Sequence, residues 1–92
     1  MTREEITAAS AGLAAAYETS ITANNAYRTA KGNKFVELSY PKDGSKKPTE
    51  SIILSLIDTD PEITALRLAA ARADAELDVK KMTYKAMIAS KE

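Results

Sequence analysis

The chain of 92 residues contains no cysteine and no histidine. Without cysteine no disulfide can form, and without either residue the usual protein ligands of zinc are missing. A chain of this length buries only about 60–65% of the surface that its unfolded form exposes, so a single copy is marginally stable. Because disulfides and such metal sites are excluded, we expect oligomerisation or a protein partner to support the fold.

An excess of one charge and a long apolar run are also lacking. Thirteen Lys and Arg balance thirteen Asp and Glu, whereas a protein that coats nucleic acid carries a basic excess. The longest strongly apolar run, Ile52–Leu54 resumed at Leu56 and Ile57, is too short to span a bilayer. The N-terminal segment has no apolar core like that of a signal peptide. We therefore expect a cytoplasmic protein that does not contact a membrane.

Motifs of catalysis are absent as well. The three glycines form no phosphate-binding loop, and no serine lies in a GxSxG turn. Asp74 and Asp78 share a helix face, but this spacing is typical of solvated helix residues. Asp58, Asp60 and Glu62 cluster where a helix starts, and we interpret them as caps. We predict that the chain is not an enzyme and has no catalytic residue, no metal site and no cofactor.

The first segment has the pattern of a long helix. Thr2 and Glu5 form a capping box at its start. Its end is predicted either at Gly32 or before Pro41, so the helix spans residues 3–31 or continues to 39. Residues 34–40 partly alternate like a strand but have no partner strand, and we favour helix or irregular structure. The face expected to pack holds Ile6, Leu13, Tyr17, Asn24 and Phe35 on one line, with Ile21, Tyr27 and Leu38 beside it.

A loop and a short helix follow. Residues 41–48 contain an Asp-Gly turn between two prolines, which predicts a loop. Thr49 is suited to cap a helix over residues 49–57. Its apolar face holds Ile52, Ile53, Leu56 and Ile57. We expect this amphipathic helix to cap the tip, which is the end of the molecule that holds the loop.

The last segment predicts a second long helix over residues 61–90. Two caps are consistent with its start: Asp60 with Pro61 at the first helical position, or a capping box of Thr59 and Glu62. No Gly or Pro follows until the end of the chain. A helix of this length extends about 45 Å.

Two apolar stripes run along this second long helix. The first, which we call the seam, has spacings of three and four residues that are typical of a coiled coil. It holds Ile63, Leu66, Ala70, Ala73, Leu77, Lys80, Tyr84 and Met87, and only Lys80 breaks it. The other, which we call the second stripe, holds Leu68, Ala75, Val79, Met82 and Ala86. Because one neighbouring helix covers one stripe, the second stripe needs another subunit, the short helix folded back, or a foreign protein.

Charge is distributed unevenly near the loop. Residues 28–47 hold six basic residues against Glu37 and Asp43, a balance of +4, whereas residues 48–66 have a balance of −4. The basic set is Arg28, Lys31, Lys34, Lys42, Lys46 and Lys47, with Tyr27, Phe35 and Tyr40 among them. Lysines beside aromatics suit single-stranded nucleic acid or an acidic partner. In a helical hairpin the two segments lie at the same end and largely cancel, so we favour a protein partner.

The segment that joins these charged regions carries a resemblance. Residues 47–53 (KPTESII) and 57–62 (IDTDPE), leading into a heptad helix, resemble the hinge of small bacteriophage-encoded helical-hairpin proteins. The resemblance covers the C-terminal half of the chain. It implies a phage accessory protein in the host cytoplasm that acts on a nucleic-acid machine.

These observations lead to one prediction of fold and function. We expect an all-α single domain over residues 1–92, an antiparallel helical hairpin or coiled coil with the short helix at the tip. The predicted function is non-catalytic protein–protein interaction, in which a phage accessory protein inhibits or recruits a nucleic-acid-processing or defence complex. A single-stranded DNA-binding or recombination accessory protein and a structural coiled-coil subunit stay open as alternatives.

Overall fold

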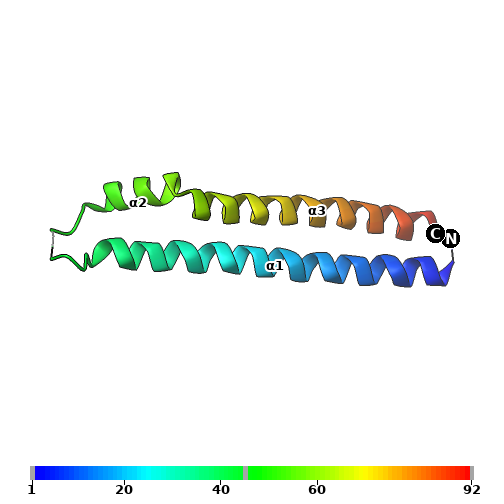
Figure 1. The fold of residues 1–92 in the computed structure, drawn as a ribbon. Coiled ribbons are helices and arrows are strands. Elements are labelled where there is room, and N and C mark those ends of the chain that lie inside the picture. The colour runs from blue at the N-terminus through cyan, green and yellow to red at the C-terminus, as the bar shows by residue number, and fades with distance from the viewer. Residues whose placement is uncertain (1, 45, 92) are drawn as a thin grey trace.

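The protein is built from helices. The computed structural model describes residues 2–44 and 46–91, which form α1 (Arg3–Ser39), α2 (Glu50–Thr59) and α3 (Pro61–Lys91). The described residues contain no strand, which confirms the all-α class. The helices α1 and α3 lie side by side, and the start of α1 lies beside the end of α3 (Figure 1). The Cα atoms extend over 65 × 17 × 17 Å, so the molecule is a rod.

The first helix reaches the later of its two predicted ends. Its start is capped by Thr2, whose hydroxyl accepts a hydrogen bond from the Glu5 amide at 3.2 Å. It then continues through Gly32 to Ser39, and residues 34–39 are helical. One glycine costs about 1 kcal/mol in a helix. Phe35 and Leu38 pack against buried residues of the other helices, and this packing offsets the cost.

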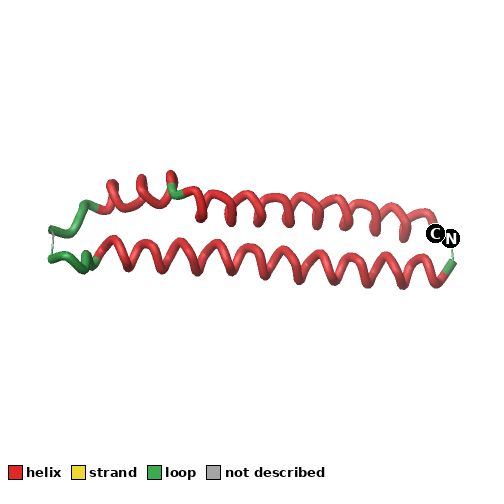
Figure 2. Tube along the Cα trace, in the orientation of Figure 1, coloured by secondary structure: helices red, strands yellow, loops and turns green. Residues whose placement is uncertain are grey.

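The connection between α1 and α2 is irregular at residues 41–44 and 46–48, as expected (Figure 2). Gly44 has a φ of 75°, a conformation that other residues rarely adopt, and its amide donates to the Pro41 carbonyl at 3.4 Å. Thr49 caps α2 by accepting from the Ile52 amide. The helix ends at Thr59, two residues later than predicted.

The short helix α2 lies at the end of the molecule that holds the loop. There it lies along α1 and roughly continues the line of α3 (Figure 1). Ile53 and Ile57 are 0% and 1% exposed, and they form a buried cluster with Ile63. The α1 residues packed against this cluster are Tyr27, Ala30, Phe35 and Leu38. In this position along α1 both isoleucines are buried.

Asp60 forms the cap of α3. Its carboxylate accepts from the amides of Glu62 at 2.9 Å and Ile63 at 3.0 Å. The Thr59 hydroxyl donates to the Ser55 carbonyl within α2, so the alternative capping box does not form. Asp60 is also 3.8 Å from the Lys34 ammonium of α1. One aspartate therefore caps α3 and ties its start to α1.

The α3 seam faces α1 as its spacing predicts. Its most buried residues are Ile63, Ala70, Ala73 and Leu77, each 7% exposed or less, and Leu66, Tyr84 and Met87 are half-buried. Lys80, which breaks the pattern, is exposed and passes beside Gly12, where an added Cβ would lie 3.8 Å from its ammonium.

The predicted packing face of α1 is only partly correct. Tyr17 and Ile21 are 42% and 59% exposed, whereas Ala16 and Ser20 are buried. The α1 residues at the contact follow spacings of three and four: Ile6, Ala9, Leu13, Ala16, Ser20, Ala23, Tyr27 and Ala30. Small residues on α1 lie opposite the alanines of the α3 seam. Small facing residues allow two helices to approach closely. The largest apolar residues of this part of α1, Tyr17 and Ile21, therefore lie on a face beside the contact.

Candidate functional site

The second stripe is exposed on α3. Leu68, Val79 and Met82 are 50%, 62% and 71% exposed, and Ala75 and Ala86 are exposed as well. The stripe lies two residues beyond the seam positions, or about 200° around the helix axis, so it points away from α1. The short helix α2 lies in line with α3 and does not fold back over it (Figure 1). No described element covers the second stripe.

The basic residues near the tip are not equally available. Lys34 lies 3.6 Å from Glu37 and 3.8 Å from Asp60, so two carboxylates neutralise it. Lys31 is half-buried, and its ammonium lies 5.8 Å from the centre of the Tyr27 ring. The remaining members of the set, Arg28, Lys42, Lys46 and Lys47, are exposed. Two of the six basic residues therefore make contacts within the protein, and the other four are exposed to solvent.

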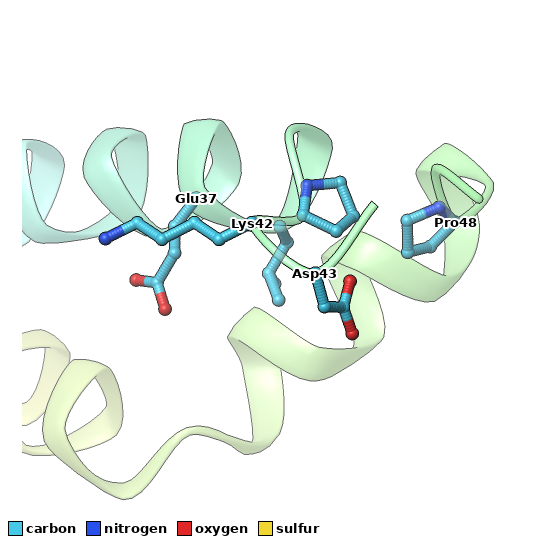
Figure 3. A pocket seen from close by; sticks show the side chains of 6 residues that line it. Glu37, Lys42, Asp43 and Pro48 are labelled. Atoms are coloured by element: carbon cyan, nitrogen blue, oxygen red, sulfur yellow. The ribbon is translucent and has the colours of Figure 1, made fainter. Parts of the chain in front are cut away.

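A hollow of about 480 Å³ lies where α1 meets the loop (Figure 3). Its lining consists of Glu37, Leu38, Pro41, Lys42, Asp43 and Pro48. The two prolines and the leucine supply apolar surface, and the two carboxylates offset the one lysine. Such mixed charge at the tip does not favour the phosphates of nucleic acid.

A polar cluster that the sequence did not reveal joins α1 to α3 near the middle of the rod. The Ser20 hydroxyl and the Asn24 amide both donate to the Asp74 carboxylate, the second at 3.0 Å. Asn24 also donates to the Ser20 carbonyl at 2.8 Å. Asp74 therefore bridges the helices although it is exposed, and Asp78, four residues on, is exposed as well. The feature of the sequence that could have predicted this cluster is Ser20 at a regular contact position of α1, together with Asp74 beside the α3 seam.

Lys81 and Tyr17 form a second polar contact between the long helices. The Lys81 ammonium lies 5.0 Å from the centre of the Tyr17 ring, which suits a cation–π interaction. Tyr17 thus has a neighbour on α3 although it is not buried between the helices. This contact accounts for one large residue of the face that was predicted to pack.

The fold and the exposed surface define an all-α, rod-shaped protein with an apolar stripe on its outer face. Within the described residues, none of the helices has an apolar stretch of the length that crossing a bilayer requires. Comparisons of the chain with models of protein families, with curated proteins and with solved structures found no match.

Proposed function

We propose that the chain is a non-catalytic protein–protein interaction module and that its docking surface is the second stripe. The observation that carries this proposal is the exposure of Leu68, Val79 and Met82 on a face without a covering element. Full burial of an exposed side chain of this size is worth about 1.5–3 kcal/mol, and each of these partly exposed side chains would contribute the corresponding part of it. Apolar residues in the centre of an interface are typical anchors of protein complexes.

The arrangement of α1 and α3 supports this role. We interpret the pair as an antiparallel coiled-coil hairpin, because its contacts recur at spacings of three and four on both helices. The bridge at Asp74 and the ion pair of Lys34 with Asp60 fix one helix against the other at two distant points. A rod held in this way presents the second stripe in a defined shape, which lowers the entropic cost of binding.

The phage accessory role stays a prediction that depends on the hinge residues 47–62. Under this proposal the protein would inhibit or recruit a nucleic-acid-processing or defence complex by contacting one of its protein subunits. A purely structural coiled-coil subunit would use the same surface. Both readings require protein contact through α3.

A capture experiment tests the proposal. Tagged wild-type protein is incubated with a lysate of the cells in which it is made and with untagged copies of itself. We expect it to retain protein, and we expect Val79→Glu with Met82→Glu to abolish retention because charges enter the apolar surface. Ile21→Glu, an equally exposed change on α1, is the control and should retain the same protein. Equal retention by the double variant would contradict the proposal.

Nucleic-acid binding is the alternative, and the three exposed loop lysines test it. If the tip bound single-stranded DNA, each phosphate contact would contribute about −0.7 to the salt slope. Changing Lys42, Lys46 and Lys47 to Glu would then abolish binding and leave helicity intact, because all three lie outside the helices. We expect no oligonucleotide binding by the wild type even at low salt, measured by fluorescence anisotropy. A tight, salt-sensitive complex that the triple variant loses would favour the alternative.

A further inference from the structure

We infer that a second copy of this chain covers the second stripe, with the two α3 helices antiparallel and Arg72 of each copy paired with Glu76 of the other. This inference rests on the proposed function, because it names the partner of the same surface. Its basis is the position of the paired polar residues relative to the apolar contact residues between α1 and α3. The outer face of α3 has charged residues at the same relative positions.

Two contacts between the long helices define these relative positions. Ser20 donates to Asp74, and Lys34 pairs with Asp60. Lys34 follows Ser20 in the sequence by as many residues as Asp60 precedes Asp74. This is the relation that antiparallel helices require. In both contacts the α1 residue follows a contact alanine by four positions. Asp74 directly follows Ala73 of the seam, and Asp60 holds the same place two heptads earlier.

Arg72 and Glu76 occupy the corresponding places relative to the second stripe. Glu76 lies at the edge of the outer face, where it also lines a hollow with Ala16 of α1. The spacing of three and four in the second stripe continues through Arg72 and Ala65, both exposed. Arg72 follows Leu68 by four positions, and Glu76 directly follows Ala75. Although the two charged residues are four apart on one helix, no ion pair forms between them or to another described residue. Each charge is therefore available to a second copy.

Size complementarity agrees with this register. With Arg72 beside Glu76 of the second copy, Leu68 lies opposite Val79 and Ala65 lies opposite Met82. Two-fold symmetry repeats each of these contacts. The large Met82 meets a small alanine, and Arg72 crosses over Ala75 to reach its acid.

Other registers are electrostatically worse. A shift of one heptad toward the C-terminus brings the two copies of Asp78 face to face. The opposite shift places Arg72 against Leu68, which buries a charge without a partner. A parallel pair would set Arg72 against itself. Like charges directly opposite each other suppress such arrangements.

The test exchanges the two charges. Sedimentation equilibrium of the wild type should give twice 9.9 kDa, and Arg72→Glu or Glu76→Arg should each raise the dissociation constant at least about tenfold. The double exchange Arg72→Glu with Glu76→Arg restores opposite charges and should recover most of the affinity. Arg28→Glu, the same charge change on an exposed α1 residue, is the control and should leave it unchanged. Circular dichroism verifies that each variant keeps its helices.

Cross-linking provides an independent measurement, because the chain has no cysteine of its own. A mixture of Leu68→Cys and Val79→Cys proteins should form the mixed disulfide in large excess over the 79–79 disulfide. A 9.9 kDa species up to millimolar concentration, an exchange that restores nothing, or a dominant 79–79 disulfide would overturn the inference. Loss of foreign-protein capture by the stripe variant would still support the proposed function in that case, so the two failures are distinguishable.

Discussion

Replacing Ile53 with alanine is expected to lower the free energy of unfolding by about 3–5 kcal/mol. Ile53 is fully buried, and it belongs to the cluster against which Phe35 and Leu38 of α1 pack. The substitution removes three carbon atoms from a fully buried position of the cluster that Ile53 forms with Ile57 and Ile63. Urea denaturation followed by circular dichroism measures the change.

The neighbouring Ile52 provides the matched control. It is 52% exposed on the same helix. Ile52→Ala therefore gives a protein with the same amino-acid composition as Ile53→Ala but leaves the buried cluster intact. We expect its cost to stay below about 1 kcal/mol. Equal losses for the two variants would show that α2 does not pack along α1 by this face.

Leu77→Ala is the second large effect, and we expect a loss of about 2–4 kcal/mol. Leu77 is 7% exposed in a stretch of the α1–α3 contact that otherwise holds mostly alanine and serine. It thus supplies much of the apolar contact there. A protein of this kind has about 5–10 kcal/mol of stability in total, so the thermal midpoint should fall visibly.

Val79→Ala separates the seam from the second stripe. The change also removes apolar atoms from α3, but Val79 is 62% exposed. At a concentration low enough for a single copy to dominate, it should alter the midpoint far less than Leu77→Ala. An unchanged midpoint for Leu77→Ala would mean that the seam assignment is wrong.

Local rules were sufficient for the existence of the three helices and for the caps of α1 and α2, but they left open the end of α1 and the choice between two caps of α3. Thr2, Thr49 and Asp60 cap where their side chains and the following residues predict. The sequence also predicted the α3 seam, because its large residues Ile63, Leu66 and Leu77 recur at regular spacing. Such signals depend only on residues close in sequence.

The face of α1 needed information about its neighbour. Tyr17 and Ile21 are the strongest apolar residues of their segment, yet alanines and Ser20 make the contact. Their small size matters only beside the alanines of α3, a relation between segments far apart in sequence. The position of α2 and the bridge at Asp74 likewise depend on which residues meet across the helices.

Thiol protection at position 79 tests the central claim, that protein covers the second stripe. In Val79→Cys and in the control Thr22→Cys, an exposed site on α1, the introduced thiol is unique in the chain. Alkylation is followed by mass spectrometry in dilute buffer and in a concentrated lysate of the cells in which the protein is made. We predict that alkylation at position 79 slows at least about tenfold in the lysate while position 22 is unaffected, in line with burial in an interface. Equal alkylation rates at position 79 in both media, or equal slowing at both positions, would contradict the account.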